Sequence, residues 1–90
     1  MLHADYGTQF KRDLKLAQKR GNDILALKEV MRKLCEEDVL PVSNKDHPLS
    51  GEWKNHRECH IQPDWLLIYF IDRSTATIRF VRNGTHSDLF

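Results

Sequence analysis

The sequence has few of the residues that mark several large protein classes. Its 90 residues include four glycines, three prolines and two cysteines, Cys35 and Cys59, which argues against a disulfide scaffold, a fibrous repeat or a low-complexity linker. No apolar run is long enough to cross a bilayer, and the N-terminus lacks the apolar stretch of a signal peptide. We therefore expect a cytoplasmic protein without a membrane partner, in which both cysteines are core residues.

A strong net charge is also missing. The formal net charge is +1, with 40% hydrophobic and 30% charged residues, which is typical of one globular domain spanning residues 1–90. The charge is nevertheless uneven, because residues 1–35 contain eight basic and four acidic side chains. A basic segment of this kind is typical either of a solvated helical face or of a surface that contacts phosphates.

Two amphipathic helices are predicted in the first half of the chain, at about 8–20 and 23–37. Apolar residues recur at helical spacing in both segments: Phe10, Leu14 and Ala17 in the first, and Ile24, Leu27, Met31 and Leu34 in the second. Thr8 and Asn22 are the expected N-caps. Gly21 suits the position after the first helix, and Pro41 follows the second.

The remaining segments predict strands. Leu2, Ala4 and Tyr6 alternate with polar residues as a short first strand, and three candidate strands follow the helices, at about 52–61, 65–71 and 75–82. The middle candidate, "WLLIYFI", is an uninterrupted apolar run, as in a strand buried on both faces. Short turns between the three favour an antiparallel meander. We therefore predict an α+β fold, with all strands in one sheet and the helices on one face.

Imidazole and carboxylate side chains gather in the second half of the chain. Residues 46–65 hold three of the five histidines and both tryptophans. In a meander, the end of the first strand, the start of the second and the end of the third meet at one edge. His60 and Asp64 are therefore expected near the residues after the third strand, which include His86. The same argument does not place His47.

Two kinds of chemistry fit such a cluster, and the first is metal binding. His56, Cys59 and His60 resemble a ligand set, but a CxxC pair is absent. Strand alternation also directs Cys59 to the face opposite the two histidines. We therefore expect neither a metal ion nor another cofactor.

The second kind of chemistry is acid/base cleavage of RNA. Attack by the 2′-hydroxyl needs a base for its proton, an acid for the leaving 5′-oxygen and a cation for the phosphorane charge. Histidine can fill each of these roles at neutral pH. The non-catalytic alternative is a binding module whose histidines are unrelated surface residues. The residues alone leave both interpretations open.

Two segments carry a family resemblance. "KDHPLSGEWKNHRECHIQPDWLLIY" fits the pattern DH-x-L-x-G-x-W, then R-[ED]-x-H-[IV]-x-PDW-[LI]-L-[IV]-Y, and "RNGTHSDLF" fits R-x-G-[ST]-H-x-x-LF. Both closely resemble the YafQ-like branch of the RelE/ParE superfamily of bacterial toxins. The motifs and the preceding helical hairpin cover nearly the whole chain.

The resemblance implies a ribosome-dependent endoribonuclease. Such a toxin cuts mRNA in the ribosomal A site without a metal ion, leaves a 2′,3′-cyclic phosphate and is neutralised by a cognate antitoxin. Matching the motifs position by position implies catalytic roles for His47, His60, Asp64 and His86. It implies that Trp65 and Phe90 shape the mRNA-binding side and that Arg82 and Arg57 are substrate-binding residues, although strand alternation places Arg57 opposite His60. A ParE-like gyrase inhibitor and a non-catalytic ribosome-binding protein remain the alternatives.

Overall fold

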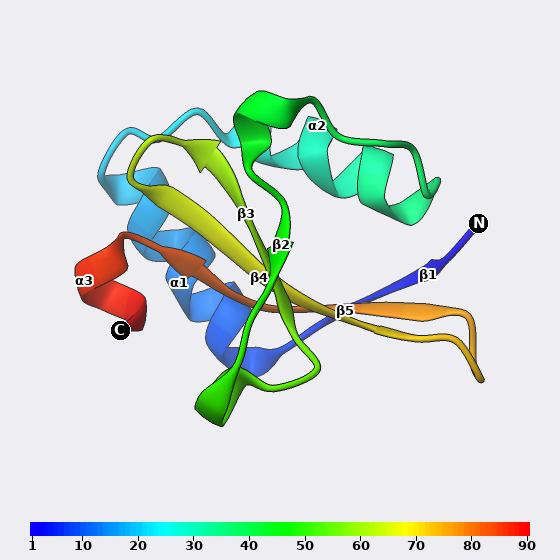
Figure 1. The fold of residues 1–90 in the computed structure, drawn as a ribbon. Helices are drawn as coiled ribbons and strands as arrows, with labels where there is room; N and C mark the ends of the chain where they lie inside the picture. The colour runs from blue at the N-terminus through cyan, green and yellow to red at the C-terminus, as the bar shows by residue number, and fades with distance from the viewer.

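The computed structural model describes residues 1–90 and contains one five-stranded sheet (Figure 1). The strands are β1 (His3–Tyr6), β2 (His47–Pro48), β3 (Arg57–Gln62), β4 (Trp65–Asp72) and β5 (Thr77–Gly84). The helices are α1 (Thr8–Lys19), α2 (Ile24–Cys35) and α3 (His86–Leu89), with 3₁₀ turns at Val42–Asn44 and Gly51–Trp53. The predicted α+β class is confirmed. None of the helices has the length and apolar character needed to span a bilayer.

The strand order is β1-β5-β4-β3-β2, with β1 parallel to β5 and every other pair antiparallel. The predicted meander of β3, β4 and β5 and the addition of β1 to its sheet are therefore confirmed. His60 pairs with Leu66, and Leu66 in turn pairs with Gly84. This register brings the end of β3, the start of β4 and the end of β5 to one edge.

The two faces of the sheet are covered differently. Alternate residues of β4 point to opposite faces, and Trp65, Leu67 and Tyr69 join the twelve-residue core beneath α1 and α2. On the other face, Leu66 and Ile68 pack with Leu89 of α3 in a cluster of three buried residues. The expectation of helices on one face holds for the two long helices, whereas the unpredicted α3 covers part of the other face.

Both predicted helix caps are wrong by one residue. Gly7 occupies the N-cap position of α1, so Thr8 is already helical, and no side chain caps that end. Asp23, rather than Asn22, caps α2 by accepting a hydrogen bond from the backbone N–H of Ala26. A carboxylate at this position also interacts favourably with the positive end of the helix dipole.

The segment before β3 differs most from the prediction. The expected strand from residue 52 begins only at Arg57, because Gly51–Trp53 forms a 3₁₀ turn and Asn55 adopts a left-handed conformation with φ of 71°. The two-residue strand β2, which was not predicted, precedes this turn and pairs His47 with Glu58. The loop thereby folds back and brings His47 to the sheet edge.

Candidate active site

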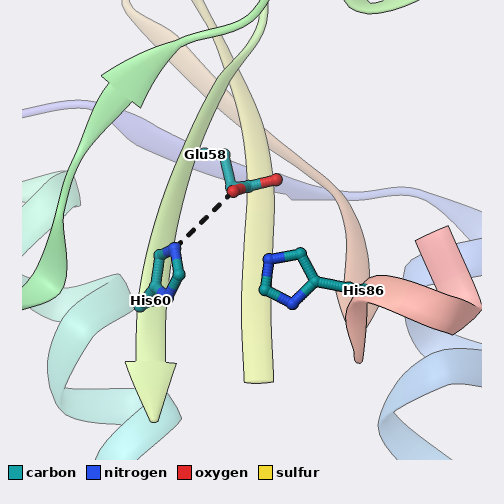
Figure 2. Close-up of side chains that lie close together, drawn as sticks. All are labelled: Glu58, His60 and His86. Atoms are coloured by element: carbon teal, nitrogen blue, oxygen red, sulfur yellow. Dashed lines mark ion pairs between the residues drawn. The ribbon is translucent and has the colours of Figure 1, made fainter. Parts of the chain in front are cut away.

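The open face of the sheet carries a cluster of ionisable side chains at the edge where the meander ends meet. Glu58 and His60 lie two residues apart on β3 and therefore point to the same face. His86 begins α3 directly after β5. Figure 2 shows the three side chains converging from these two elements. The rings of His60 and His86 lie with their centroids 5.8 Å apart.

Asp64 holds His86 through two contacts. One Asp64 carboxylate oxygen accepts the backbone N–H of His86 at 3.0 Å and lies 2.7 Å from its ring Nδ1. Because an ionised carboxylate only accepts hydrogen bonds, Nδ1 carries a proton, and Nε2 is the free nitrogen. Both hydrogen bonds, with that of the backbone first, lower the pKa of the Asp64 carboxyl. Figure 2 shows one ring nitrogen of His86 facing Glu58 and the other facing away.

The turn that carries His86 is itself closely held. The side chain of Thr85 accepts the backbone N–H of Asp88, and the Asp88 carboxylate accepts that of Thr85 in a reciprocal capping box. Asp88 also forms an ion pair with Arg20, which lies just after α1. A side chain at Gly84 would meet Asp88 at 2.9 Å, so the close approach of strand and helix requires glycine. His86 is thus positioned by its turn as well as by Asp64.

Glu58 is the buried acid of the cluster. Its side chain is 5% exposed, and its Oε1 lies 3.6 Å from His47 Nε2 and 3.8 Å from His60 Nε2. Its second oxygen, Oε2, is buried without any hydrogen-bond partner. Burying a carboxylate oxygen without a partner is costly. Glu58 is therefore a candidate functional residue of the cluster.

His47 approaches the same carboxylate from β2. Its Nδ1 lies 2.6 Å from the carbonyl oxygen of Lys45, which can only accept, so Nδ1 is the donor and Nε2 is the nitrogen that faces Glu58. The structure therefore brings together all four residues predicted as catalytic. His47 and His60 flank Glu58, and Asp64 orients His86 beside them.

The positions of the two aromatic residues expected on the substrate side differ. Phe90 directly follows α3, and its side chain is exposed, so its ring is available to stack on a base. Trp65 is only 3% exposed and belongs to the core beneath α1 and α2, where its indole N–H donates to Asn83. Trp65 therefore supports the site from within the core, because the first residue of β4 points to the helical face.

The two predicted arginines also lie away from the cluster. Arg82 donates to Asp13 of α1 through Nε at 2.7 Å, so its guanidinium is held against the helical side. Arg57 lies near Asp46 at 3.4 Å, on the face opposite Glu58 and His60, as alternation predicted. Neither guanidinium is placed beside the histidines.

Glu58 is the functional candidate that the sequence interpretation missed. The signal was present, because an acidic residue occupies the second position of the R-[ED]-x-H block and lies two residues before His60 on one strand. Cys59, between them, is buried in the helical core, and burial raises the pKa of its thiol. The rejected ligand set of His56, Cys59 and His60 is accordingly not assembled.

The whole chain matches one protein family. Residues 2–90 fit the family described as "Bacterial toxin of type II toxin-antitoxin system, YafQ". The chain belongs to this YafQ family. Over 87 residues it is 46% identical to a relative from Escherichia coli K12 named "mRNA interferase toxin YafQ", and the match covers 96% of this chain and 92% of the relative. The predicted resemblance is confirmed, and the expected endoribonuclease class agrees with the name of this YafQ relative.

Solved structures of relatives share the fold. The YafQ chain in a structure described as the E. coli DinJ-YafQ complex is 44% identical, with a TM-score of 0.91 over 100% of this chain and 99% of that one. A toxin from Helicobacter pylori, described as metal-bound, is 43% identical with a TM-score of 0.94 over 100% of both chains. The YafQ fold therefore extends over all the elements that position the cluster.

Proposed function

We propose that this YafQ-family protein is an endoribonuclease that cleaves mRNA on the ribosome by acid/base chemistry. The observation that carries the proposal is the Asp64–His86 pair, which presents an imidazole nitrogen toward His60, Glu58 and His47 on an open sheet face. Three imidazoles within one cluster supply both a proton acceptor and a proton donor near neutral pH. No metal ion is needed for these two transfers.

The first transfer removes the proton of the ribose 2′-hydroxyl. We assign it to the pair of His47 and His60, whose Nε2 atoms both face Glu58. The 2′-oxygen then attacks the phosphorus atom, and the bond from phosphorus to the 5′-oxygen breaks. The products are a 2′,3′-cyclic phosphate and a 5′-hydroxyl. Which of the two histidines takes the proton is decided by the distance of each from the 2′-oxygen once RNA is bound.

The second transfer protonates the leaving 5′-oxygen, and we assign it to His86. A general acid must keep its donor nitrogen aligned with the leaving group. The Asp64 contact on Nδ1 and the capping-box turn fix the direction of the ring. In the imidazolium form, which carries a proton on both ring nitrogens, Nε2 is the donor available to substrate. Asp64 is a positioning residue in this scheme. Its lowered pKa keeps it ionised throughout the range in which histidines titrate.

The small number of cations in the hollow beside His60 favours a ribosome-held substrate. The hollow beside His60 has a volume of about 340 Å³, and Lys45 is the only cation among its lining residues. Non-specific RNA affinity depends largely on cations that contact phosphates. This hollow therefore offers few phosphate contacts of its own, and we expect the ribosome to present the strand. The basic residues of 1–35 supply a surface for ribosomal RNA.

The partner that neutralises the protein is expected to be an antitoxin. A groove of about 540 Å³ runs between β1, α1 and α2, with Phe10, Leu14 and Met31 on its apolar floor and a basic rim formed by Lys11 and Lys28. Arg32 also lines the groove but is paired with Glu29 and Glu36. Its chemistry fits an amphipathic segment that carries acidic residues. We propose that the cognate antitoxin docks such a segment here.

Mapping mRNA ends on translating ribosomes tests the function. We expect cuts within codons on ribosomes, slower cutting of the same RNA alone, and cyclic phosphate at the new 3′ ends. Unchanged mRNA together with inhibited DNA gyrase would overturn the proposal in favour of a gyrase inhibitor. Ribosome binding without cleavage would favour a non-catalytic ribosome-binding protein.

A paired measurement tests the docking groove. Reversing two rim charges with Lys11→Glu and Lys28→Glu should weaken the complex with the antitoxin encoded beside the gene, as measured by calorimetry. Reversing Lys54, which lies in a different segment, is the matched control and should leave that affinity unchanged. Equal affinities in all three proteins would contradict the assigned groove.

A further inference from the structure

A second polar cluster lies on the helical side of the sheet, behind the candidate active site. It consists of Tyr69 on β4, Arg57 on β3 and Asp46, which directly precedes β2. The Tyr69 hydroxyl donates to the Asp46 carboxylate at 2.6 Å, and Nε of Arg57 lies 3.4 Å from the same carboxylate. None of the three side chains takes part in the proposed proton transfers. The cluster is therefore a candidate for a supporting role.

Tyr69 reaches Asp46 from inside the protein. The residue is 1% exposed and belongs to the core beneath α1 and α2. A buried phenol hydroxyl needs a hydrogen-bond partner, and this one finds its partner beside β2, two strands away in the sheet. Burial, and then the Asp46 carboxylate, raise the pKa of the hydroxyl, so it remains a donor at neutral pH. Tyr69 thus connects the segment before β2 to the central strand.

His47, the residue after Asp46, has few contacts of its own. Its side chain is 45% exposed, and β2 is only two residues long. The second of these residues, Pro48, has no backbone N–H to donate to the sheet. The ring of His47 contacts the carbonyl oxygen of Lys45 through Nδ1 at 2.6 Å. The direction of the ring therefore depends on the conformation of the two residues before it.

Lys45 adopts a left-handed conformation, with φ of 48° and ψ of 43°. A residue with a side chain seldom adopts this conformation unless the surrounding structure imposes it. On one side, the side-chain amide of Asn44 donates to the backbone carbonyl of His60 at 2.7 Å. On the other side, Asp46 accepts from Tyr69. The turn that directs the Lys45 carbonyl to the imidazole is therefore held at both ends.

We propose that Asp46 and Tyr69 are positioning residues for His47. Arg57 is the second partner of the Asp46 carboxylate. Consecutive residues of an extended chain point to opposite faces. Anchoring Asp46 on the helical side therefore directs His47 to the open side, where its Nε2 lies 3.6 Å from Glu58 Oε1. The inference rests on the proposed function, in which His47 is one of two residues assigned to the 2′-hydroxyl proton. It adds that this imidazole meets the substrate in a fixed tautomer and direction.

Nuclear magnetic resonance tests the positioning without any assay of activity. Long-range proton–nitrogen spectra distinguish the two neutral tautomers of a histidine ring. We expect His47 to be protonated on Nδ1 in the parent, because that nitrogen faces the Lys45 carbonyl. Tyr69→Phe, which removes only the hydroxyl, and Asp46→Ala should each produce a mixture of tautomers. The signals of His3, at the opposite edge of the sheet, should not change. An unchanged His47 tautomer in both folded variants would overturn the proposal.

Single-turnover cleavage on saturating ribosomes measures the consequence for the reaction. A small misplacement of a reacting group lowers rates by up to about 10²-fold, so Tyr69→Phe and Asp46→Ala should each cut about 10- to 100-fold more slowly. Asp46→Asn keeps an oxygen that accepts the phenol hydrogen bond and should recover most of the parental rate. Affinity for ribosomes should be parental in all three variants. Tyr6→Phe, at the opposite edge of the sheet, is the matched control and should cut at the parental rate.

A double-mutant cycle separates positioning from general destabilisation. If Tyr69 acts through His47, Tyr69→Phe should add almost nothing to the loss caused by His47→Ala. Urea denaturation corrects each rate for the folded fraction. A full additional loss in the double variant, or a parental rate in folded Asp46→Ala, would overturn the positioning role. Absence of cleavage by the parent would instead contradict the proposed function, while the tautomer measurement would still decide whether these contacts position His47.

Discussion

The helical and open faces of the sheet differ in what they bury. The helical face encloses a core of twelve buried residues beneath α1 and α2, whereas the open face has three buried apolar residues beside the polar cluster. Burial of apolar surface is the main source of folding stability. The open face instead buries polar groups whose burial is costly, such as Glu58. We therefore expect stability to depend mainly on the helical face and the proposed chemistry on the open face, and substitutions should separate the two.

The largest expected effect is on the rate, from a change on the open face. His86→Gln keeps the size of the side chain and its hydrogen bonding but cannot donate a proton near neutrality. Loss of a general acid lowers rates about 10²- to 10⁴-fold, while the melting temperature should change little because the ring is exposed. Single-turnover cleavage of ribosome-bound mRNA measures the rate. The exposed His3→Gln is the control, and a Gln variant as fast as its parent would assign the acid role to His60 or His47.

The next effect is on stability, from a change on the helical face. Leu27 is fully buried in the core, and Leu27→Ala should lower the free energy of unfolding by about 2–5 kcal/mol. The rate per folded molecule should remain at the parental value. Urea denaturation measures the free energy of unfolding. Dividing the observed cleavage rate by the folded fraction gives the rate per folded molecule. Leu25→Ala on the exposed side of α2 is the control, and a lower rate in fully folded Leu27→Ala would show that the two faces are coupled.

A smaller effect, on both stability and cleavage rate, is expected from Asp13, which connects the helical face to the strand that leads to His86. This buried carboxylate of α1 accepts hydrogen bonds from Arg82 and from the backbone N–H of Asn83, just before the turn that carries His86. Asp13→Ala should cost about 1.5–3 kcal/mol, as expected for lost hydrogen bonds to a charged group. It should also lower the cleavage rate, but less than His86→Gln does.

Asp5→Ala is the matched control for this prediction. Asp5 pairs with Arg79 at the exposed edge of the sheet, with more than half of each side chain exposed, so its removal should hardly change stability. A parental rate in folded Asp13→Ala would mean that Asp64 and the capping box position His86 without help from α1.

The smallest expected effect is a pH dependence carried by Asp88. Hydrogen bonds from the Arg20 side chain, and then from the Thr85 backbone, lower the pKa of this carboxyl. Because the folded state lowers the pKa, the contribution of Asp88 to stability is complete above the ordinary carboxyl pKa and is lost as the pH falls below it. Asp88→Asn should therefore destabilise the protein slightly at pH 7 and have less effect near pH 2. Thermal melts at both pH values measure this, and an equal loss at both would contradict the role of the charge.

Most of the fold could be predicted from local sequence patterns. The spacing of Phe10, Leu14 and Ala17 identified α1, and the apolar run of β4 identified the central strand. The meander then predicted that His60, Asp64 and His86 lie close together. In this topology the end of the first strand, the start of the second and the end of the third meet at one edge of the sheet. Each predicted N-cap was one residue from the observed one, because Gly7 and Asp23 lie next to residues with similar preference for the N-cap position.

The missed features depended on contacts between distant segments. A two-residue strand such as β2 has no periodicity to detect, so only the resemblance implied that His47 belongs to the site. Trp65 matched a substrate-side motif but is the first residue of a strand buried on both faces, and alternation directs it to the core. Arg82 was expected to contact substrate, but its partner Asp13 lies 69 residues earlier in the chain.

The sequence by itself determined the elements, the meander and the residue types available for chemistry, because periodicity and turn residues act over a few neighbours. Only the tertiary structure decided which of these residues share a site. The pairing of β2 with β3 brought His47 to Glu58, and the turn into α3 placed His86 on Asp64. It also buried a Glu58 oxygen with no partner. The physical reason is that burial and electrostatic contact depend on distance in space, which the local pattern of a sequence does not specify.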